Sequence, residues 1–113
     1  MEQKYGAFTQ QILVAIEQNL QHKNCLKQLE ATFLKEHPNF AQHFEQEVGR
    51  TLEEYIIKQR LKQSEKLLEQ KELSVKDISK AIGFNGYFEF TQLFKRFNGI
   101  SPVSYRTQML KGI

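Results

Sequence analysis

Apolar residues recur along the chain at intervals of three and four, which is the spacing of one face of an α-helix, and strand-like alternation is absent. Phe8, Ile12, Ile16 and Leu20 form one such series, and glycine and proline fall between the series. The pattern predicts an all-α fold of about seven helices joined by short loops. The predicted helices cover residues 5–21, 24–35, 38–48, 51–70, 74–83, 87–97 and 101–110.

Polar residues and prolines at the predicted helix starts support these boundaries. Thr51 and Glu54 have the spacing of a capping box, in which each side chain bonds the backbone N–H of the other residue. Ser74 has the position of an N-cap before the fifth helix. Proline suits the first turn of a helix, so Pro38 is expected at the start of the third helix and Pro102 at the start of the last.

The chain repeats itself at an offset of fifty residues. Each copy reads as a short helix, a tight turn, a second helix, a glycine stop and a capped next helix, which is a helix-turn-helix module. We expect one domain, 1–113, with a first module at about 24–50, a linker helix at 51–70, a second module at 74–98 and a closing helix at 101–110. The residues Phe40, Gln42, Phe44, Gly49, Thr51 and Tyr55 recur as Phe90, Gln92, Phe94, Gly99, Ser101 and Tyr105.

The later helix of the second module, 87–97, has two contrasting faces at 100° per residue. Phe88 lies opposite the apolar arc, where a large apolar side chain needs an explanation. One explanation is a binding surface, and the alternative is that Phe88 folds back against a neighbouring helix. The expected core residues are Phe90, Leu93, Phe94 and Phe97, and the opposite face carries Phe88, Gln92, Lys95 and Arg96, with Glu89 and Thr91 at its edges.

The corresponding helix of the first module, 38–48, has a different charge. Phe40 and Phe44 are expected in the core. Glu45 and Gln46 take the positions that Lys95 and Arg96 have in the second copy, so this face is acidic where its counterpart is basic. The residues expected to face away from the core are Pro38, Gln42 and Glu45, with Asn39 and Gln46 less squarely placed.

The charge of the chain is distributed unevenly between its halves. Residues 1–49 hold four Lys or Arg and six Asp or Glu, whereas residues 50–113 hold twelve and seven. A basic C-terminal half indicates a polyanionic partner, and the alternative is an ordinary solvated basic surface. A linker helix of 20 residues is about 30 Å long, close to the roughly 34 Å of one DNA turn. Two modules could therefore enter adjacent major grooves of double-stranded DNA.

The exposed residues of the helix 87–97 have the chemistry that such a role requires. Glutamine can bond adenine through two hydrogen bonds in the major groove, which suits Gln92, and Phe88 can contact a thymine methyl group. Thr91, Lys95 and Arg96 suit phosphates. These residues predict a sequence-specific DNA-binding domain. The alternative from another class is a helical protein–protein interaction domain whose repeat serves packing alone.

Other chemistry is not indicated by the sequence. His22 and Cys25 have an acceptable metal-ligand spacing, but His37 and His43 are six residues apart and cannot converge on one helix. No phosphate-binding glycine loop or nucleophile elbow is present, so we expect no enzyme activity, no cofactor and no metal. A single cysteine and the lack of a long apolar run predict a cytoplasmic protein without a membrane segment.

Three segments resemble the C-terminal signature of the AraC/XylS-type bacterial transcription regulators, and Tyr55 to Leu68 is similar to the linker helix of that family. The resemblance covers about residues 25–107 and implies seven helices with two helix-turn-helix modules that bind adjacent major grooves. The three segments are Leu73-Ser-Val-Lys-Asp-Ile-Ser-Lys-Ala-Ile-Gly-Phe84, Phe90-Thr-Gln-Leu-Phe-Lys95 and Asn98-Gly-Ile-Ser-Pro-Val-Ser-Tyr-Arg106.

The resemblance also implies which residues contact DNA and which partners are involved. It implies RNA polymerase as a further partner, and a separate effector-binding domain that is absent from this chain. The chain departs from the family in having Ser64 and Ser79 where alanine is usual, and Glu45 where lysine or arginine is common. The implied base-reading positions are Pro38, Ala41 and Gln42 in the first module and Tyr87, Phe88, Glu89 and Gln92 in the second, with Thr91 at a phosphate position.

Overall fold

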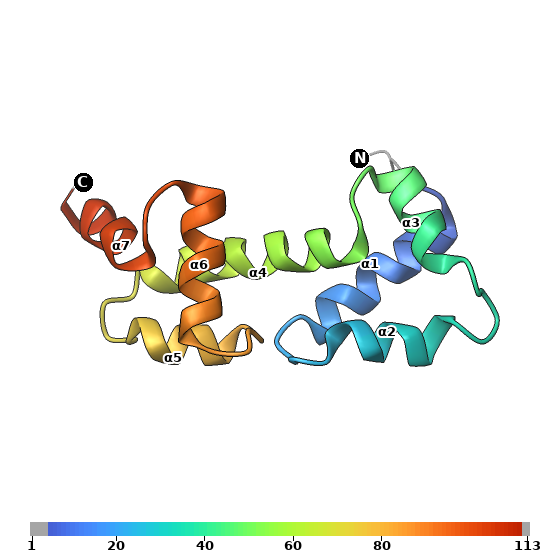
Figure 1. Ribbon diagram of the computed structural model, residues 1–113, viewed down its shortest axis with the longest axis horizontal. Helices are drawn as coiled ribbons and strands as arrows, with labels where there is room; N and C mark the ends of the chain where they lie inside the picture. Colours follow the sequence, from blue (N-terminus) through green and yellow to red (C-terminus); the bar gives the residue numbers. More distant parts are fainter. Residues whose placement is uncertain (1–4, 112–113) are drawn as a thin grey trace. The chain divides into compact units, whose positions relative to one another are not determined.

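A computed structural model of the chain describes residues 5–111, and this part consists of seven helices without a strand (Figure 1). The all-α prediction is therefore confirmed, and the predicted boundaries lie within two residues of those found, as is usual at helix ends. The helices are α1 (Ala7–Asn19), α2 (Cys25–Phe33), α3 (Phe40–Val48), α4 (Leu52–Leu68), α5 (Val75–Ala81), α6 (Tyr87–Asn98) and α7 (Pro102–Lys111).

The chain divides into two compact units, with the boundary between Ile56 and Ile57 inside α4. Unit 1, which ends at Ile56, contains α1, α2, α3 and the first turn of α4, and α1 contacts both α2 and α3. Each of these helices contributes the side chains on its apolar face, because burial of that face stabilises the helix in water. The core of unit 1 consists of Ile12, Ile16, Leu20, Cys25, Leu29, Phe33, Phe40, Phe44, Leu52 and Ile56.

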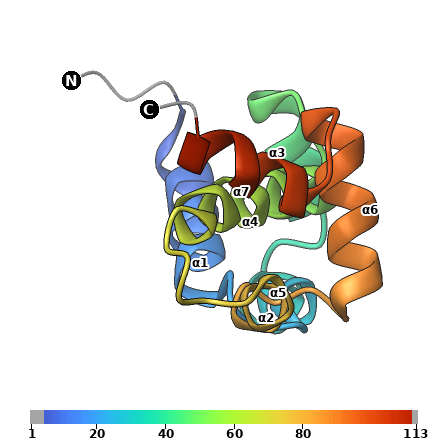
Figure 2. The same cartoon turned by 90° about the vertical axis from the view of Figure 1, so that its left-hand side faces the viewer.

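Unit 2 starts at Ile57 and packs α5, α6 and α7 with the remainder of α4. Helix α5 runs across the N-terminal end of α6, and α7 lies beside its C-terminal end (Figures 1 and 2). The two serines that replace the usual alanines, Ser64 and Ser79, are fully buried, and each hydroxyl donates to a carbonyl of its own helix. The buried core consists of Leu61, Leu68, Ile78, Ile82, Phe84, Phe90 and Phe94.

The fifty-residue repeat corresponds to repeated packing. The ring of Phe44 meets Tyr55 edge-on at 5.5 Å, and the ring of Phe94 meets Tyr105 edge-on at 5.4 Å. Burial is the main cause that raises the pKa of both tyrosines, so their phenols remain neutral at physiological pH. Gly49 ends α3 in the left-handed region at a φ of 85°, and glycine is favoured there because it lacks a Cβ. Its counterpart after α6 has a φ of 80°.

The predicted caps are present. The backbone N–H of Thr51 donates to the Glu54 carboxylate at 2.9 Å, and that of Glu54 donates to the Thr51 hydroxyl at 3.1 Å. Ser74 accepts from the backbone N–H of Asp77 at 2.9 Å, which caps α5. Caps of this kind each stabilise a helix by about 0.5–2 kcal/mol. Pro102 occupies the first helical position of α7 and is buried.

Two predictions about single residues are wrong. Pro38 precedes α3 by two residues, because the Phe40 N–H bonds the carbonyl of His37 in a separate turn before the helix begins. Phe97 is 43% exposed in the last turn of α6, because that turn extends past the cluster that buries Phe90 and Phe94.

Candidate nucleic-acid interface

Helix α6 presents one continuous exposed stripe on the side opposite its buried phenylalanines. Phe88, Gln92, Lys95 and Arg96 are all exposed, at the spacing of i, i+4, i+7 and i+8. The tight turn through Asn85 and Gly86 starts the helix so that its first turn is accessible. The stripe combines a flat apolar group, an amide and two cations, which are the groups that contact base edges and phosphates in the major groove.

Phe88 is the most exposed of the large apolar residues in the described chain. Its side chain is 75% accessible, so the alternative that it folds back onto a neighbouring helix is wrong. Tyr87, the preceding residue and the first of α6, is 42% accessible. Burying two adjacent aromatic rings on a partner surface would recover apolar area that is exposed to water in the free chain. Two aromatic side chains are thus exposed side by side in sequence at the N-terminal end of α6.

Two residues predicted at the edge of this face are engaged differently. The Glu89 carboxylate accepts the backbone N–H of Asn85 at 2.8 Å, which stabilises the turn before α6. Thr91 is half-buried, and its hydroxyl oxygen is enclosed without a hydrogen-bond partner among residues 5–111. A different χ1 rotamer would be needed for that hydroxyl to reach a phosphate. In the present conformation neither side chain belongs to the exposed stripe.

The basic residues of unit 2 have two different roles. Arg60 is buried with its guanidinium 5.6 Å from the ring centre of Phe84. Arg106 donates to the carbonyls of Leu68 at 2.9 Å and Gln70 at 3.1 Å, where it caps the end of α4. These two cations stabilise unit 2 through contacts within it, and they add less positive charge to its surface than exposed cations do. Other cations of the unit are exposed, among them Lys95 and Arg96 on α6 and Lys76 and Lys80 on α5.

Lys76 and Lys80 were not among the residues predicted from the sequence. They lie four positions apart on α5, the spacing of neighbours on one helix face, and both are exposed. Their spacing of four positions on a predicted helix is the sequence signal that could have identified them as neighbouring surface cations. They add two positive charges to the same unit as the α6 stripe, which strengthens the attraction of unit 2 for a polyanion.

The exposed face of α3 is polar and acidic. Glu45 forms no ion pair or side-chain hydrogen bond within residues 5–111, so its charge is not neutralised by a basic neighbour on the linker helix. Gln46 is exposed beside it. The predicted contact residues of this module, Pro38, Asn39, Ala41 and Gln42, are all exposed.

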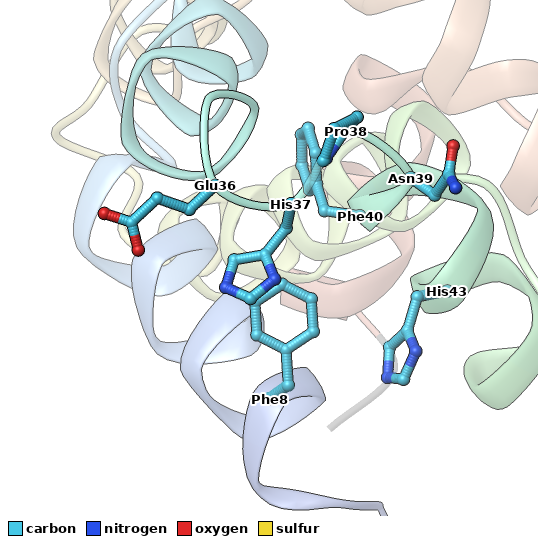
Figure 3. A pocket seen from close by; sticks show the side chains of 7 residues that line it. All are labelled: Phe8, Glu36, His37, Pro38, Asn39, Phe40 and His43. Atoms are coloured by element: carbon cyan, nitrogen blue, oxygen red, sulfur yellow. The ribbon is translucent and has the colours of Figure 1, made fainter.

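A hollow on one flank of α3 lies next to the first turn of α1 (Figure 3). The ring centre of Phe8 lies 4.2 Å from that of the His37 imidazole. The ring centre of His43 lies 5.3 Å from that of Phe8. Glu47 accepts the backbone N–H of Gly6 at 2.6 Å, which ties the start of α1 to α3. The hollow is lined by Phe8, Glu36, His37, Pro38, Asn39, Phe40 and His43.

Residues 5–111 contain neither a cluster of metal ligands nor a membrane-spanning helix. Within the described residues no group of three or more His, Cys, Asp or Glu side chains could hold a metal ion. The single thiol, Cys25, is buried in the core of unit 1. No helix of the described part is long and apolar enough to cross a bilayer.

A sequence model described as "Helix-turn-helix domain" matches residues 36–108, which is more than half of the chain. The chain therefore belongs to the AraC/XylS-type helix-turn-helix family, a family of DNA-binding transcription regulators, and the resemblance seen in the sequence is confirmed. The Msm operon regulatory protein of Streptococcus mutans is 35% identical over 66 residues, which are 58% of this chain and 24% of that protein. This chain thus spans about a quarter of the length of that relative.

Solved structures support the same fold. The C-terminal domain of AraT, a response regulator from Geobacillus stearothermophilus, is similar with a TM-score of 0.85 and 21% identity, covering 94% of this chain and 88% of that one. The DNA-binding domain of AdpA, a global transcriptional factor solved in complex with a target DNA, has a TM-score of 0.77 and 25% identity, covering 90% and 92%. Seven helices without strands in residues 5–111 agree with this all-helical fold.

Proposed function

We propose that this chain binds double-stranded DNA sequence-specifically and that α6 is its main reading element. The observation that carries the proposal is the exposed stripe of Phe88, Gln92, Lys95 and Arg96 opposite the buried face of α6. Gln92 would bond a base edge, and Phe88 with Tyr87 would contact apolar base edges such as the thymine methyl. Lys95 and Arg96 would bind the phosphates that flank them.

We also propose that α3 enters an adjacent major groove and binds there more weakly. Pro38, Ala41 and Gln42 are small or neutral groups able to approach base edges, and Asn39 precedes the first turn of the helix. Glu45 places a negative charge near the phosphates, which reduces the electrostatic attraction on this side. The two modules are therefore unequal, and the second supplies most of the affinity.

The proposal for the full protein is a larger, effector-responsive transcription regulator that acts on promoter operators in the bacterial cytoplasm. The coverage of the Msm regulator, about a quarter of its length, supports a longer protein. Contact with RNA polymerase is the proposed route from operator binding to transcription. No catalytic step is needed for this activity, because binding at a promoter is sufficient to change the rate of transcription from it.

A titration of the chain with random-sequence duplex DNA at about 50 and 200 mM salt tests the proposal. Binding should weaken steeply with salt, because each phosphate contact releases condensed counterions. The matched control is a neutral polymer under the same conditions. A chain that did not bind duplex DNA at either salt concentration would be a helical protein-interaction domain instead.

Gln92→Ala is expected to cost about 1–3 kcal/mol at the preferred operator, because the alanine cannot donate or accept hydrogen bonds at a base edge. Preference should relax at one or two base pairs, while binding to random DNA changes little. The measurement is a competition of operator variants, selected first from a random pool with the wild-type chain. If Gln92→Ala bound every operator variant as tightly as the wild type does, α6 would not be the reading helix.

A further inference from the structure

Unit 1 contains a groove between α2, α3 and the start of α4 that has no partner within the described residues. Its floor is apolar and includes Leu26, Leu34 and Ala41, and Leu34 is 46% exposed there. Three carboxylates from three different helices, those of Glu30, Glu45 and Glu53, line the same groove. None of the three has an ion pair or side-chain hydrogen bond in residues 5–111, and no basic residue lines the groove.

Unit 2 carries a surface of the opposite kind on α7. Val103 and Leu110 are 51% and 46% exposed, and seven residues place them about two turns apart on one helix face. Lys111 is exposed beside Leu110, and α7 contains no acidic residue. Helix α7 therefore presents spaced apolar side chains with positive charge, whereas the groove presents an apolar floor with negative charge.

We propose that α7 of one copy of this chain docks into the groove on α2, α3 and α4 of a second copy. Val103 and Leu110 cover the apolar floor, and Lys111 approaches the carboxylates of the rim. Burial of apolar area and the attraction of Lys111 to the three carboxylates both favour the contact. One contact thus gives a partner to two surfaces that are otherwise exposed to water on the same molecule.

The contact is head-to-tail, because the surface that donates differs from the surface that accepts. Each copy has one α7 and one groove, so two copies joined by one such contact keep one α7 and one groove unoccupied. The groove shares Ala41 with the residues proposed to contact DNA. A copy docked in it would therefore compete with DNA for the first module.

The experiment uses the full chain without DNA, so its outcome does not depend on the proposed function. Sedimentation velocity at protein concentrations up to about 1 mM should show association that weakens as salt rises from about 50 to 500 mM. Leu34→Lys blocks the groove and Leu110→Glu blocks the helix, and each variant alone should associate at least about tenfold more weakly than wild type. Both residues are exposed, so neither change removes a core side chain.

The decisive sample is the mixture of the two variants. The intact α7 of Leu34→Lys can enter the intact groove of Leu110→Glu, so the mixture should form a dimer that cannot grow further. Val14→Lys is the matched control, because Val14 is 51% exposed on α1 outside the groove and its replacement should leave association unchanged. Circular dichroism confirms that each variant is folded. A wild-type chain that stays monomeric, a mixture that stays monomeric, or a loss of association in Val14→Lys would each overturn the proposal.

Discussion

Lys95→Glu is expected to abolish nearly all DNA binding, whereas Glu45→Lys is expected to tighten it. The two residues occupy the same position in the fifty-residue repeat, one turn before the left-handed glycine that ends each helix, and both are exposed. Each substitution changes the charge near the phosphates by two. The steepness of the fall in log affinity with log salt should therefore decrease by about two units for Lys95→Glu and increase by up to two units for Glu45→Lys. Sequence preference should change little, because phosphate contacts carry no base information.

The measurement is a set of titrations at about 50 and 200 mM salt for the wild type and both variants. Lys66→Glu on α4 is a matched control for the change in net charge, because Lys66 is an exposed cation outside both proposed reading helices. A silent Glu45→Lys together with a strong Lys95→Glu would show that the second module alone anchors DNA. Silence of both would mean that the docking face proposed for α3 and α6 is wrong.

Phe94→Ala and Phe44→Ala are each expected to lower the free energy of unfolding by about 3–5 kcal/mol. Both rings are fully buried, and each is in contact with the tyrosine of its own repeat. Truncation leaves a cavity beside that tyrosine, and the surrounding helices relax only partly. A loss of this size is a large part of the roughly 5–15 kcal/mol that stabilises a typical domain.

Urea denaturation followed by circular dichroism measures the total loss, and amide hydrogen exchange locates it. Because the two residues belong to separate clusters, Phe44→Ala should mainly increase exchange in unit 1 and Phe94→Ala in unit 2. Phe88→Ala, the matched exposed control, should change the unfolding free energy by no more than about 0.5 kcal/mol. Equal loss of protection throughout the chain for either core variant would contradict separate clusters.

Much of the fold could be predicted from the sequence, because the relevant signals are local. The capping box at Thr51 and Glu54 depends on residues three positions apart, and it forms as predicted. The burial of Phe40 and Phe44, and of Phe90 and Phe94, follows from the helical period and the apolar arc. The repeat required only a comparison of the chain with itself, and both copies place the second phenylalanine edge-on against the repeated tyrosine.

The prediction failed where the outcome depends on how far a neighbouring element extends. Phe97 shares the apolar arc of α6, yet it is 43% exposed and does not belong to the cluster that buries Phe90 and Phe94. Leu34 lies within the helix predicted at 24–35, but α2 ends at Phe33 and Leu34 lines the groove of unit 1. Periodicity predicts the direction of a side chain but cannot show whether another element reaches it.

The candidate site divides in the same way between sequence and tertiary structure. The sequence alone determined the helix type, the two modules, the family and the stripe of Phe88, Gln92, Lys95 and Arg96, because each depends on residue identity and spacing along one helix. Only the tertiary structure decided that Glu89 bonds the turn before α6, that the Thr91 hydroxyl is enclosed, and that Arg60 and Arg106 stabilise unit 2. These roles depend on hydrogen-bond partners and on burial, which become fixed only when the helices pack together.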